Sequence, residues 1–508
     1  MILSLIAVLF GGFVLHLYNV YWLRPERLRR RLRTQGIVGP PPSFPFGNVA
    51  EMKRIELDER RARMDWGTTM HNYDSAVIPC FDLWRKEYGP LYMYTTGNTV
   101  TLYVARPDLV KEINLCTSLD LGKPMYLRKV HEPLFGNGIL KSNGPIWAHQ
   151  RKIISPQFYM DKVKAMVDLM VDSTEQMLRS WEDSLNSNGG GVTEIRVDDD
   201  LRILSSNVIS RACFGSNHTK GNAIFLKLRS LQASMAKHNH LSLSPLWRSD
   251  QGHWKVSREI QSSILKLVQE HRESSAAMEK NLLQAMLESA DGDLDPDVAE
   301  HFIVDNFKSI YFAGHETTAV VASWCLMLLA LHPDWQTRAR AEVVEICGGR
   351  PPNADSLNKL KTLTMIIQET LRLYPPGVSV AREALQDTKL GDIYLPKGAN
   401  LFIPISTLHH DILIWGTDAD SFNPLRFARG VSGACDVPHA YVPFGVGARS
   451  CLGQYFAMTE MKVVLSLLLA AFEFELSPSY RHSPVLRMIV QPEFGVSLLV
   501  KRCVHCDD

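Results

Sequence analysis

One cysteine of this chain lies in a glycine-dense loop, residues 444–453, which leads directly into an apolar segment with helical spacing. The loop reads Phe444-Gly-Val-Gly-Ala-Arg-Ser-Cys451-Leu-Gly453. Glycine has no Cβ and therefore allows a backbone to approach a planar ligand closely. A cysteine thiolate that holds haem iron pushes electron density onto the metal and favours cleavage of the O–O bond. The loop thus predicts a haem site with Cys451 as axial ligand, and oxygen activation as its chemistry.

Three other interpretations of the loop stay open at this point. A lone buried cysteine is most often an inert packing residue. The pair Gly445-Val-Gly447 has the form of a phosphate-binding loop, but the third glycine of that fingerprint would fall at Ser450. A zinc site would find only Cys435 and His439 nearby as further ligands, and their spacing is poor.

A second unusual stretch, Ala313-Gly-His-Glu-Thr-Thr318, interrupts a long apolar segment at 296–332. Such a segment predicts a central buried helix. Polar groups in the middle of a buried helix cost free energy unless they are satisfied or used. Glu316 and Thr317 are therefore either a local salt bridge with a kink or a functional pair. His315 lies about 100° round the helix from Glu316, so we expect it to be a packing residue.

Two further pairs have the spacing of neighbours on a helix. Trp147 and Arg151 are four residues apart; their N–H groups suit a haem propionate, although an ordinary amphipathic pair has the same spacing. Glu369 and Arg372 are three residues apart, which is also the spacing of a routine surface ion pair. Arg426 is a candidate third partner of that pair.

These residues resemble the motifs of the cytochromes P450, whose haem-binding signature matches residues 444–453 at all five fixed positions. The family's Trp-x-x-x-Arg, Ala-Gly-x-Glu-Thr-Thr, Glu-x-x-Arg and Pro-x-Arg-Phe motifs precede it in one order. Two residues depart from the pattern: Ala448 stands where many plant members have proline, and Leu425 replaces a frequent acid. The resemblance covers the chain from about residue 39 to about residue 500.

The resemblance implies a mainly α fold with small β-sheets (α+β), preceded by one N-terminal transmembrane helix, and haem b as cofactor. It implies that Glu316 and Thr317 deliver protons to the oxygen being reduced, while Gly314 leaves room for dioxygen. Haem binding is implied for Cys451, Trp147, Arg151, Arg382, Arg449, Phe444 and Gly314. A structural core beside the haem is implied for Glu369, Arg372 and Arg426.

Members of the family cover the substrate with a long loop, which corresponds here to the glycine- and proline-rich residues 120–145. We expect Gly377, Val378, Ser379 and Val380, on a short strand, to face the substrate. If the substrate carries a carboxylate, the cationic candidates of the loop are Lys123, Arg128 and His131. Alternation around a Gly97-Asn98 turn also predicts a β-hairpin over residues 91–105.

The chain has 508 residues and a net charge of +1, so its charge does not indicate nucleic-acid binding. Its nine cysteines form no clustered framework, which is typical of reduced thiols and not of a disulfide scaffold. The Cys503-Val-His-Cys506 spacing has no second ligand pair, which argues against zinc.

Residues 2–23 contain no Lys, Arg, Asp or Glu and are long enough to cross the roughly 30 Å core of a bilayer. A signal peptide is the alternative, but its charged n-region and cleavage site are not evident. Six arginines follow at 24–33, so the positive-inside rule leaves the rest of the protein cytosolic. We expect an anchor at 1–23, a basic and proline-rich linker at 24–48 and a haem-thiolate monooxygenase domain at 49–508. The resemblance places the single-pass anchor in the endoplasmic reticulum.

Within the family, four segments resemble one plant subfamily: residues 39–43, 47–48, 142–151 and 480–484. That subfamily oxidises gibberellins and related ent-kaurane diterpenoids, and relatives within it act on pentacyclic triterpenoids. The resemblance therefore implies an enzyme that hydroxylates or epoxidises a hydrophobic terpenoid, with a gibberellin or related diterpenoid favoured over a triterpenoid.

All residues are used by the anchor, the linker and the haem domain, so electrons for O2 are expected from a separate NADPH-cytochrome P450 reductase. A haem-binding sensor or carrier without catalysis is the rival from another class. It would keep the cysteine loop but would not need Glu316 and Thr317. A family member that rearranges peroxides without a reductase would be expected to alter the same pair, which is intact here.

Overall fold

The computed structural model describes residues 2–62, 71–187, 189–215, 218–238, 251–273, 281–293 and 296–503. Cys506, and with it one half of the Cys-x-x-Cys spacing, lies outside these residues.

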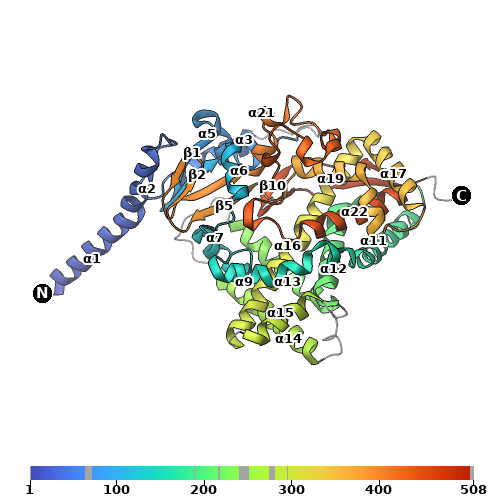
Figure 1. Ribbon diagram of the computed structural model, residues 1–508, viewed down its shortest axis with the longest axis horizontal. Helices are drawn as coiled ribbons and strands as arrows, with labels where there is room; N and C mark the ends of the chain where they lie inside the picture. Colours follow the sequence, from blue (N-terminus) through green and yellow to red (C-terminus); the bar gives the residue numbers. More distant parts are fainter. Residues whose placement is uncertain are drawn as a thin grey trace.

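A long helical run at the N-terminus begins with a helix, α1, that projects from the rest of the molecule and ends with one, α2, that lies beside it (Figure 1). It consists of α1 (Ile2–Tyr18), the π-helix η1 (Asn19–Leu23) and α2 (Arg24–Arg33). The most apolar part of this run has 0% of its residues buried, whereas the described residues hold two other helices of sufficient length and hydropathy that are 83% and 50% buried. The N-terminal run is therefore the candidate membrane span, as the sequence predicts.

The expected linker begins with a packed helix, α2. Arg29 is 2% exposed and donates to Glu26 Oε2 at 2.9 Å and to Thr95 Oγ1 at 3.4 Å. Leu32 is fully buried in the main core. The ring of Phe44 lies 5.8 Å from that of Trp22, at the end of the anchor. The basic part of this segment is thus helical and packs against the main body of the protein.

One long helix, α16 (Pro296–Leu331), runs through the middle of the body (Figure 1). Its sequence is apolar on nearly all sides, as a helix enclosed by others must be. The helices packed against it include α12 (Val197–Phe214), α15 (Leu282–Asp293), α19 (Lys361–Leu373) and α22 (Gln454–Ala471). The central buried helix expected from the sequence is present.

Further helices complete the body. The longer ones are α3 (Val49–Ala62), α5 (Pro79–Tyr88), α6 (Pro107–Leu115), α9 (Gly144–Ile154), α11 (Val167–Ser187), α13 (His218–His238), α14 (Gln251–Glu273) and α17 (Pro333–Cys347). The shorter ones are α4 (Asp74–Val77), α7 (Met125–Val130), α8 (Glu132–Phe135), α10 (Met160–Lys164), α18 (Ala354–Lys359), α20 (Ile405–His409), α21 (Ile412–Trp415), and the 3-10 turns η2 (Ser155–Phe158), η5 (Pro424–Arg429), η6 (Val431–Gly433), η7 (Pro438–Ala440) and η8 (Gly447–Arg449).

The largest sheet has the strand order β1-β2-β8-β5-β3. Its strands are β1 (Leu91–Thr96), β2 (Thr99–Val104), β3 (Leu121–Gly122), β5 (Ser379–Ala384) and β8 (Asn400–Pro404). β1 and β2 pair antiparallel, with Tyr94 opposite Thr101, which confirms the hairpin expected at 91–105. β8 runs parallel to β2 and antiparallel to β5.

Three smaller sheets lie elsewhere in the described residues. They are β4 (Val192–Arg196) with β12 (Ser497–Arg502) and β9 (Phe472–Leu476), β6 (Thr388–Leu390) with β7 (Ile393–Leu395), and β10 (Pro484–Arg487) with β11 (Ile489–Pro492). The small sheets beside a helical body confirm the expected α+β class.

The long segment at 120–145 is more regular than the sequence predicts, because it contains β3, α7 and α8. Its end is held against α16. The N–H of Asn137 donates to Asp305 Oδ2 at 2.8 Å, and the N–H of Ile139 donates to Asn306 Oδ1 at 2.9 Å. The segment therefore covers part of the central helix.

Candidate functional site

The cysteine loop is closed by its own backbone. The N–H of Cys451 donates to the carbonyl oxygen of Phe444 at 2.8 Å. Gly445 and Gly447 have φ values of +77° and +69°, in the left-handed region that other residues rarely adopt. A Cβ on Gly447 would also meet the carbonyl oxygen of Ile113 at 2.6 Å. The geometry of the loop therefore requires glycine most strictly at position 447.

The loop presents the sulfur of Cys451 to a cavity of about 250 Å³. The surface of this residue is accessible from the cavity, whose wall it forms, while protein surrounds it on the other sides. Burial by the surrounding protein raises the pKa of the thiol, against the lowering effects of the Gly453 N–H and the charge of Arg151. A metal cation at the sulfur would favour the thiolate, which is the form that ligates metals.

Helix α16 forms another wall of the same cavity. Ala313, Gly314 and Thr317 all line it. The Thr317 hydroxyl donates to the carbonyl oxygen of Ala313 at 2.8 Å. A Cβ on Gly314 would come within 2.8 Å of the Ile209 side chain, so this glycine permits α12 to pack closely. Thr317 and Cys451 therefore meet the same enclosed space from different elements.

Glu316 lies outside the cavity wall, on the side of α16 that faces α12. Its side chain is buried, with Oε1 3.1 Å from His315 Nε2 and Oε2 3.7 Å from Arg202 Nε. Burial raises the pKa of the carboxyl, but His315, Arg202 and Arg229 outweigh it, so the net shift is downward. The acid is thus held as a carboxylate one residue away from Thr317.

Two of the arginines expected to hold haem propionates bind the cysteine loop itself. Arg151 donates to the carbonyl oxygen of Ser450 at 2.8 Å. Arg382 is 3% exposed and donates to the carbonyl oxygen of Val446 at 3.1 Å. Both guanidiniums are therefore anchored by backbone oxygens on the loop that carries Cys451.

The third arginine, Arg449, stacks on the indole of Trp147. The centre of its guanidinium lies 4.3 Å from the ring centroid. It donates to the carbonyl oxygen of Ser142 at 3.0 Å and to Asn143 Oδ1 at 2.8 Å. Trp147 and Arg449 line the cavity and also a small hollow that contains Arg382. The four expected propionate donors are thus gathered at one end of the site.

The described part of the chain places no acidic side chain beside these cations. Among the described residues, no carboxylate lies within ion-pair distance of Arg151, Arg382 or Arg449. Burial, followed by the charge of Arg449, lowers the pKa of Arg382 to about 9. Burial, followed by the charge of Arg151, lowers the pKa of Arg449 to about 10. Buried cations are normally paired with anions, so this donor set fits the carboxylates of a haem.

Of the cations considered for a substrate carboxylate, Lys123 alone lines the cavity. Burial, followed by nearby cations, holds the pKa of its ammonium well below the usual range. Arg128 donates instead to Asn137 Oδ1 at 3.5 Å. His131 Nδ1 lies 2.7 Å from Lys141 Nζ. Lys123 therefore lies with the propionate donors, and the other two candidates lie apart from the cavity.

The aliphatic residues proposed to face substrate, Val378 and Val380, are buried but are not part of the cavity wall. Of the residues expected there, Gly377 lines the cavity, together with the preceding Pro376. Ser309, which was not among the expected site residues, also lines the cavity, about two helical turns before Thr317. That spacing on α16 was the signal available in the sequence.

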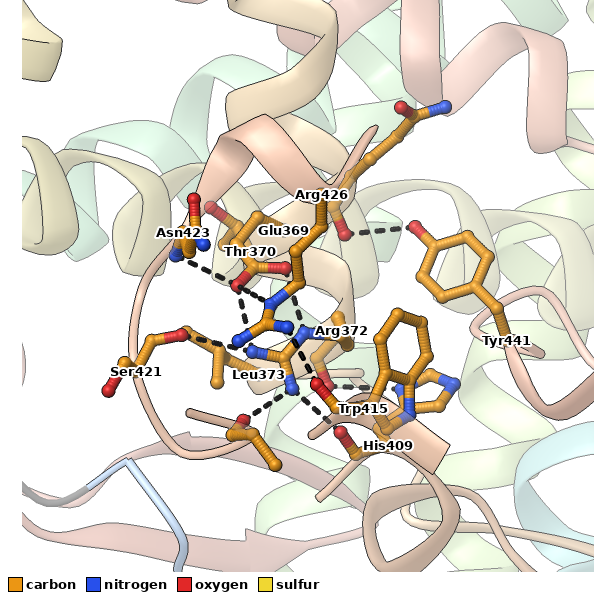
Figure 2. Close-up of polar contacts among 12 residues, drawn as sticks. Glu369, Thr370, Arg372, Leu373, His409, Trp415, Ser421, Asn423, Arg426 and Tyr441 are labelled. Carbon is orange, nitrogen blue, oxygen red and sulfur yellow. Dashed lines mark hydrogen bonds and ion pairs between the residues drawn. The ribbon is translucent and has the colours of Figure 1, made fainter. Parts of the chain in front are cut away.

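Glu369, Arg372 and Arg426 lie together in a buried cluster (Figure 2). Arg426 Nε lies 3.4 Å from Glu369 Oε1, and its Nη1 donates to the carbonyl oxygen of Trp415 at 2.7 Å. The surface-pair alternative for Glu369 and Arg372 is therefore excluded. The cluster joins α19 to the segment that leads into the cysteine loop.

Comparison with known proteins agrees with this geometry. The family model "Cytochrome P450" matches residues 75–500. Cytochrome P450 714B2 of Oryza sativa subsp. japonica is 52% identical, with 96% of this chain and 94% of the relative covered. Cytochrome P450 714B3 of Zea mays is 51% identical (99% and 96%), and cytochrome P450 714A2 of Arabidopsis thaliana is 45% identical (96% and 95%).

Members of this family bind haem through a cysteine thiolate and use O2 with a redox partner. The matched region contains the cysteine loop, the central helix and the arginines around them. This chain therefore belongs to the cytochrome P450 family and is a monooxygenase.

Proposed function

We propose that this protein holds haem b through the thiolate of Cys451 and oxidises a hydrophobic terpenoid. The observation that carries the proposal is that Cys451 and Thr317 line one cavity whose wall is otherwise largely apolar. A thiolate-ligated haem supplies O–O cleavage, which allows one oxygen atom of O2 to enter a C–H bond or an alkene.

Each polar residue of the site has a distinct task in this reaction. The N–H groups of Trp147 and of the three nearby arginines bind the propionates and fix the orientation of the haem. The hydroxyl of Thr317 holds water in the cavity by a hydrogen bond. Glu316 supplies protons from the side of α16 that faces α12, as a general acid. Gly314 leaves space on the cavity wall beside Thr317.

The substrate class that we favour is a gibberellin or a related ent-kaurane diterpenoid, with a pentacyclic triterpenoid as the alternative. The resemblance of residues 39–43, 142–151 and 480–484 to one plant subfamily supports this choice. Ile139, Leu140 and Ile310 give the cavity an aliphatic surface suited to a terpenoid skeleton. Lys123, on the same wall as Arg151 and Arg449, is the basic residue of the segment at 120–145 that a carboxylate of such a diterpenoid would meet.

We further propose that the anchor lies in the endoplasmic reticulum membrane, with the catalytic body in the cytosol. The uncharged helix α1 and the arginine-rich α2 behind it support this orientation by the positive-inside rule. Electrons then come from NADPH-cytochrome P450 reductase in the same membrane. Residues 49–508 act as the monooxygenase domain behind the anchor and the basic segment at 24–48.

The ligand assignment is tested by the absorption of the reduced CO complex. We expect the wild-type protein to give the spectrum of a thiolate-ligated haem and Cys451→Ser to lose it. A Cys451→Ser protein that kept this spectrum would exclude Cys451 as the ligand. Cys435→Ser is a matched control, because Cys435 lies outside the cavity wall, and it should keep the spectrum.

The substrate assignment is tested by incubating the protein with reductase, NADPH and a panel of gibberellins, other ent-kauranes and pentacyclic triterpenoids. Oxidation of a diterpenoid supports the proposal, and oxidation of triterpenoids alone would replace it with the alternative. Consumption of no substrate by a haem-loaded protein would favour the non-catalytic haem protein. Lys123→Met should weaken binding of acidic diterpenoids more than that of neutral ones, whereas Arg128→Met should change neither.

A further inference from the structure

His315 occupies a position that packing alone does not explain. It is 1% exposed on α16, and its ring meets that of Phe225 edge-on, with centroids 4.3 Å apart. Both ring nitrogens nevertheless have polar partners. Nδ1 lies 2.7 Å from the carbonyl oxygen of Tyr311, and Nε2 lies 3.1 Å from Glu316 Oε1.

These contacts determine where the hydrogens of the ring must be. A carbonyl oxygen only accepts, so Nδ1 of His315 must carry a hydrogen and donate it to Tyr311. In a neutral ring Nε2 would then present a lone pair to Glu316, whose ionised carboxylate also offers only lone pairs. One further proton must therefore lie between Nε2 and Oε1. Either His315 is an imidazolium beside a carboxylate, or it is neutral beside a carboxylic acid.

The groups that face this pair from the surrounding elements favour the charged arrangement. From α12, Arg202 Nε lies 3.7 Å from Glu316 Oε2. From α13, the charge of Arg229 also acts on the carboxyl. Against the effect of burial, these cations and His315 together keep the pKa of Glu316 below its usual value. These cations therefore favour the arrangement in which Glu316 is the carboxylate.

Arg202 in turn connects the buried pair to the surface. Its Nη1 donates to Asp198 Oδ2 at 2.7 Å, and its Nη2 donates to Gln491 Oε1 at 3.4 Å. Nη1 also lies 3.7 Å from Asp199 Oδ1, and the Asp199 side chain is 46% exposed. A guanidinium does not lose its proton, so Arg202 orients Glu316 and does not carry the proton itself. Two charged side chains, Arg202 and Asp199, thus lie between Glu316 and solvent.

We propose that His315 is a second proton-holding residue of the site, which shares one exchangeable proton with Glu316, and that Arg202 is the positioning residue of this pair. This inference rests on the proposed role of Glu316. In each transfer the Nε2–H bond of His315 breaks and an O–H bond forms on Glu316 Oε1. The O–H bond of the acid then breaks as a water held by the Thr317 hydroxyl takes the proton, which restores the carboxylate, and a proton taken up from solvent re-forms the Nε2–H bond of His315.

The first test needs no haem chemistry. Infrared difference spectra of the full-length protein, recorded across a pH series, detect carboxyl groups that gain or lose a proton, and Glu316→Gln identifies the contribution of Glu316. In His315→Gln we expect this contribution to titrate about one pH unit or more higher, because a charged partner has been lost. Phe225→Leu is the matched control: it removes the ring contact but keeps both hydrogen bonds of His315. An unchanged titration in His315→Gln would overturn the shared proton.

The second test measures coupling in the haem-loaded protein with reductase and substrate. His315→Gln should lower product formation by about tenfold or more, since a general acid or base contributes about 10²- to 10⁴-fold. It should also raise the share of electrons lost as hydrogen peroxide and the solvent isotope effect. Equal losses in Phe225→Leu, or normal coupling in His315→Gln, would assign His315 to packing. The reduced CO spectrum of each variant reports the haem–thiolate site separately, so a failure there is distinguished from a failure of the proton pair.

Discussion

Arg372 and Glu369 bind each other through two parallel hydrogen bonds, with both side chains 0% exposed. Arg372 Nε donates to Glu369 Oε2 at 2.7 Å, and its Nη2 donates to Oε1 at 2.8 Å (Figure 2). The same guanidinium donates to the carbonyl oxygens of His409, Ala419 and Ser421. A planar guanidinium can serve all these acceptors at once, whereas the compact ammonium of lysine cannot. The planar shape of the Arg372 guanidinium therefore matters more for these contacts than its positive charge alone.

We expect Arg372→Lys to destabilise the protein by about 3–5 kcal/mol, as when a buried ion pair is broken, although the charge is kept. Urea or guanidinium unfolding of the purified protein measures the change. Lys86→Ala removes an exposed ion pair with Asp82 and serves as the control, for which we expect less than about 1 kcal/mol. Equal effects of the two substitutions would contradict the structural role of Arg372.

The two left-handed glycines of the cysteine loop provide a matched pair of substitutions. Gly445→Ala adds a methyl group that meets nothing closer than Val380 Cγ2 at 3.9 Å, so only the cost of the left-handed backbone remains, about 1–2 kcal/mol. Gly447→Ala adds the same backbone cost and a clash with the carbonyl oxygen of Ile113. We expect Gly447→Ala to lower both thermal stability and haem content more than Gly445→Ala. The order of the two variants, and not their absolute values, is the critical outcome.

The sequence predicts those parts of the site whose residues lie close together in the chain. Cys451 and its glycines are within one loop, and Gly314 and Thr317 are within one turn of one helix. Burial of Glu369 was also implied once the motif order was recognised. In each case a short stretch of backbone positions the residues, so residue types at fixed spacing are sufficient to predict their arrangement.

The parts that were not predicted depend on contacts between distant segments. Arg202 precedes Glu316 by more than a hundred residues, and only the packing of α12 on α16 brings them together. Lys123 points to the cavity while His131 does not, because β3, α7 and α8 give the expected loop a regular structure. The contact between His315 and Glu316 was not predicted, because angular position on an ideal helix does not show that adjacent side chains can bond.

We expect the substitution Arg382→Met to weaken haem binding without lowering the stability of the haem-free protein. Without an anion, the buried charge of Arg382 lies beside that of Arg449, and burial and this neighbour disfavour it. Arg382→Met should therefore not lower the stability of the haem-free protein. Haem affinity should fall about tenfold to hundredfold, since a hydrogen bond to a charged group contributes about 1.5–3 kcal/mol. Haem titration and thermal unfolding of both forms measure the two effects.

The control for this experiment is Lys129→Met, which removes an exposed cation from α7 outside the cavity wall. It should leave both haem affinity and haem-free stability unchanged. An equal loss of haem affinity in Lys129→Met would show that overall charge, and not the position of Arg382, determines binding. A loss of stability in haem-free Arg382→Met would show that its contacts with Ala381 and Val446 outweigh its buried charge.

Glu460, on α22 next to the cavity residue Met461, gives a pH-dependent prediction. It is 1% exposed, and burial raises the pKa of its carboxyl to about 8, from a usual value of 4.5. Below pH 4.5 the carboxyl is neutral in both the folded and the unfolded protein, so it does not affect stability. Between 4.5 and about 8 the unfolded protein loses the proton first, which increasingly favours unfolding. Above about 8 the penalty is complete and constant.

Glu460→Gln removes this penalty because its amide never ionises. The stability of the variant relative to wild type should therefore increase as the pH rises from about 5 to about 8, and then level off, at about 1.4 kcal/mol for each unit of the pKa difference. Unfolding midpoints measured at about pH 5, 7 and 9 give the profile. Glu345→Gln, at an exposed position on α17, should give a flat profile over the same range. A difference between Glu460→Gln and wild type that stays constant with pH would mean that Glu460 ionises as readily in the folded protein as in the unfolded chain, and would exclude burial as the factor that sets its pKa.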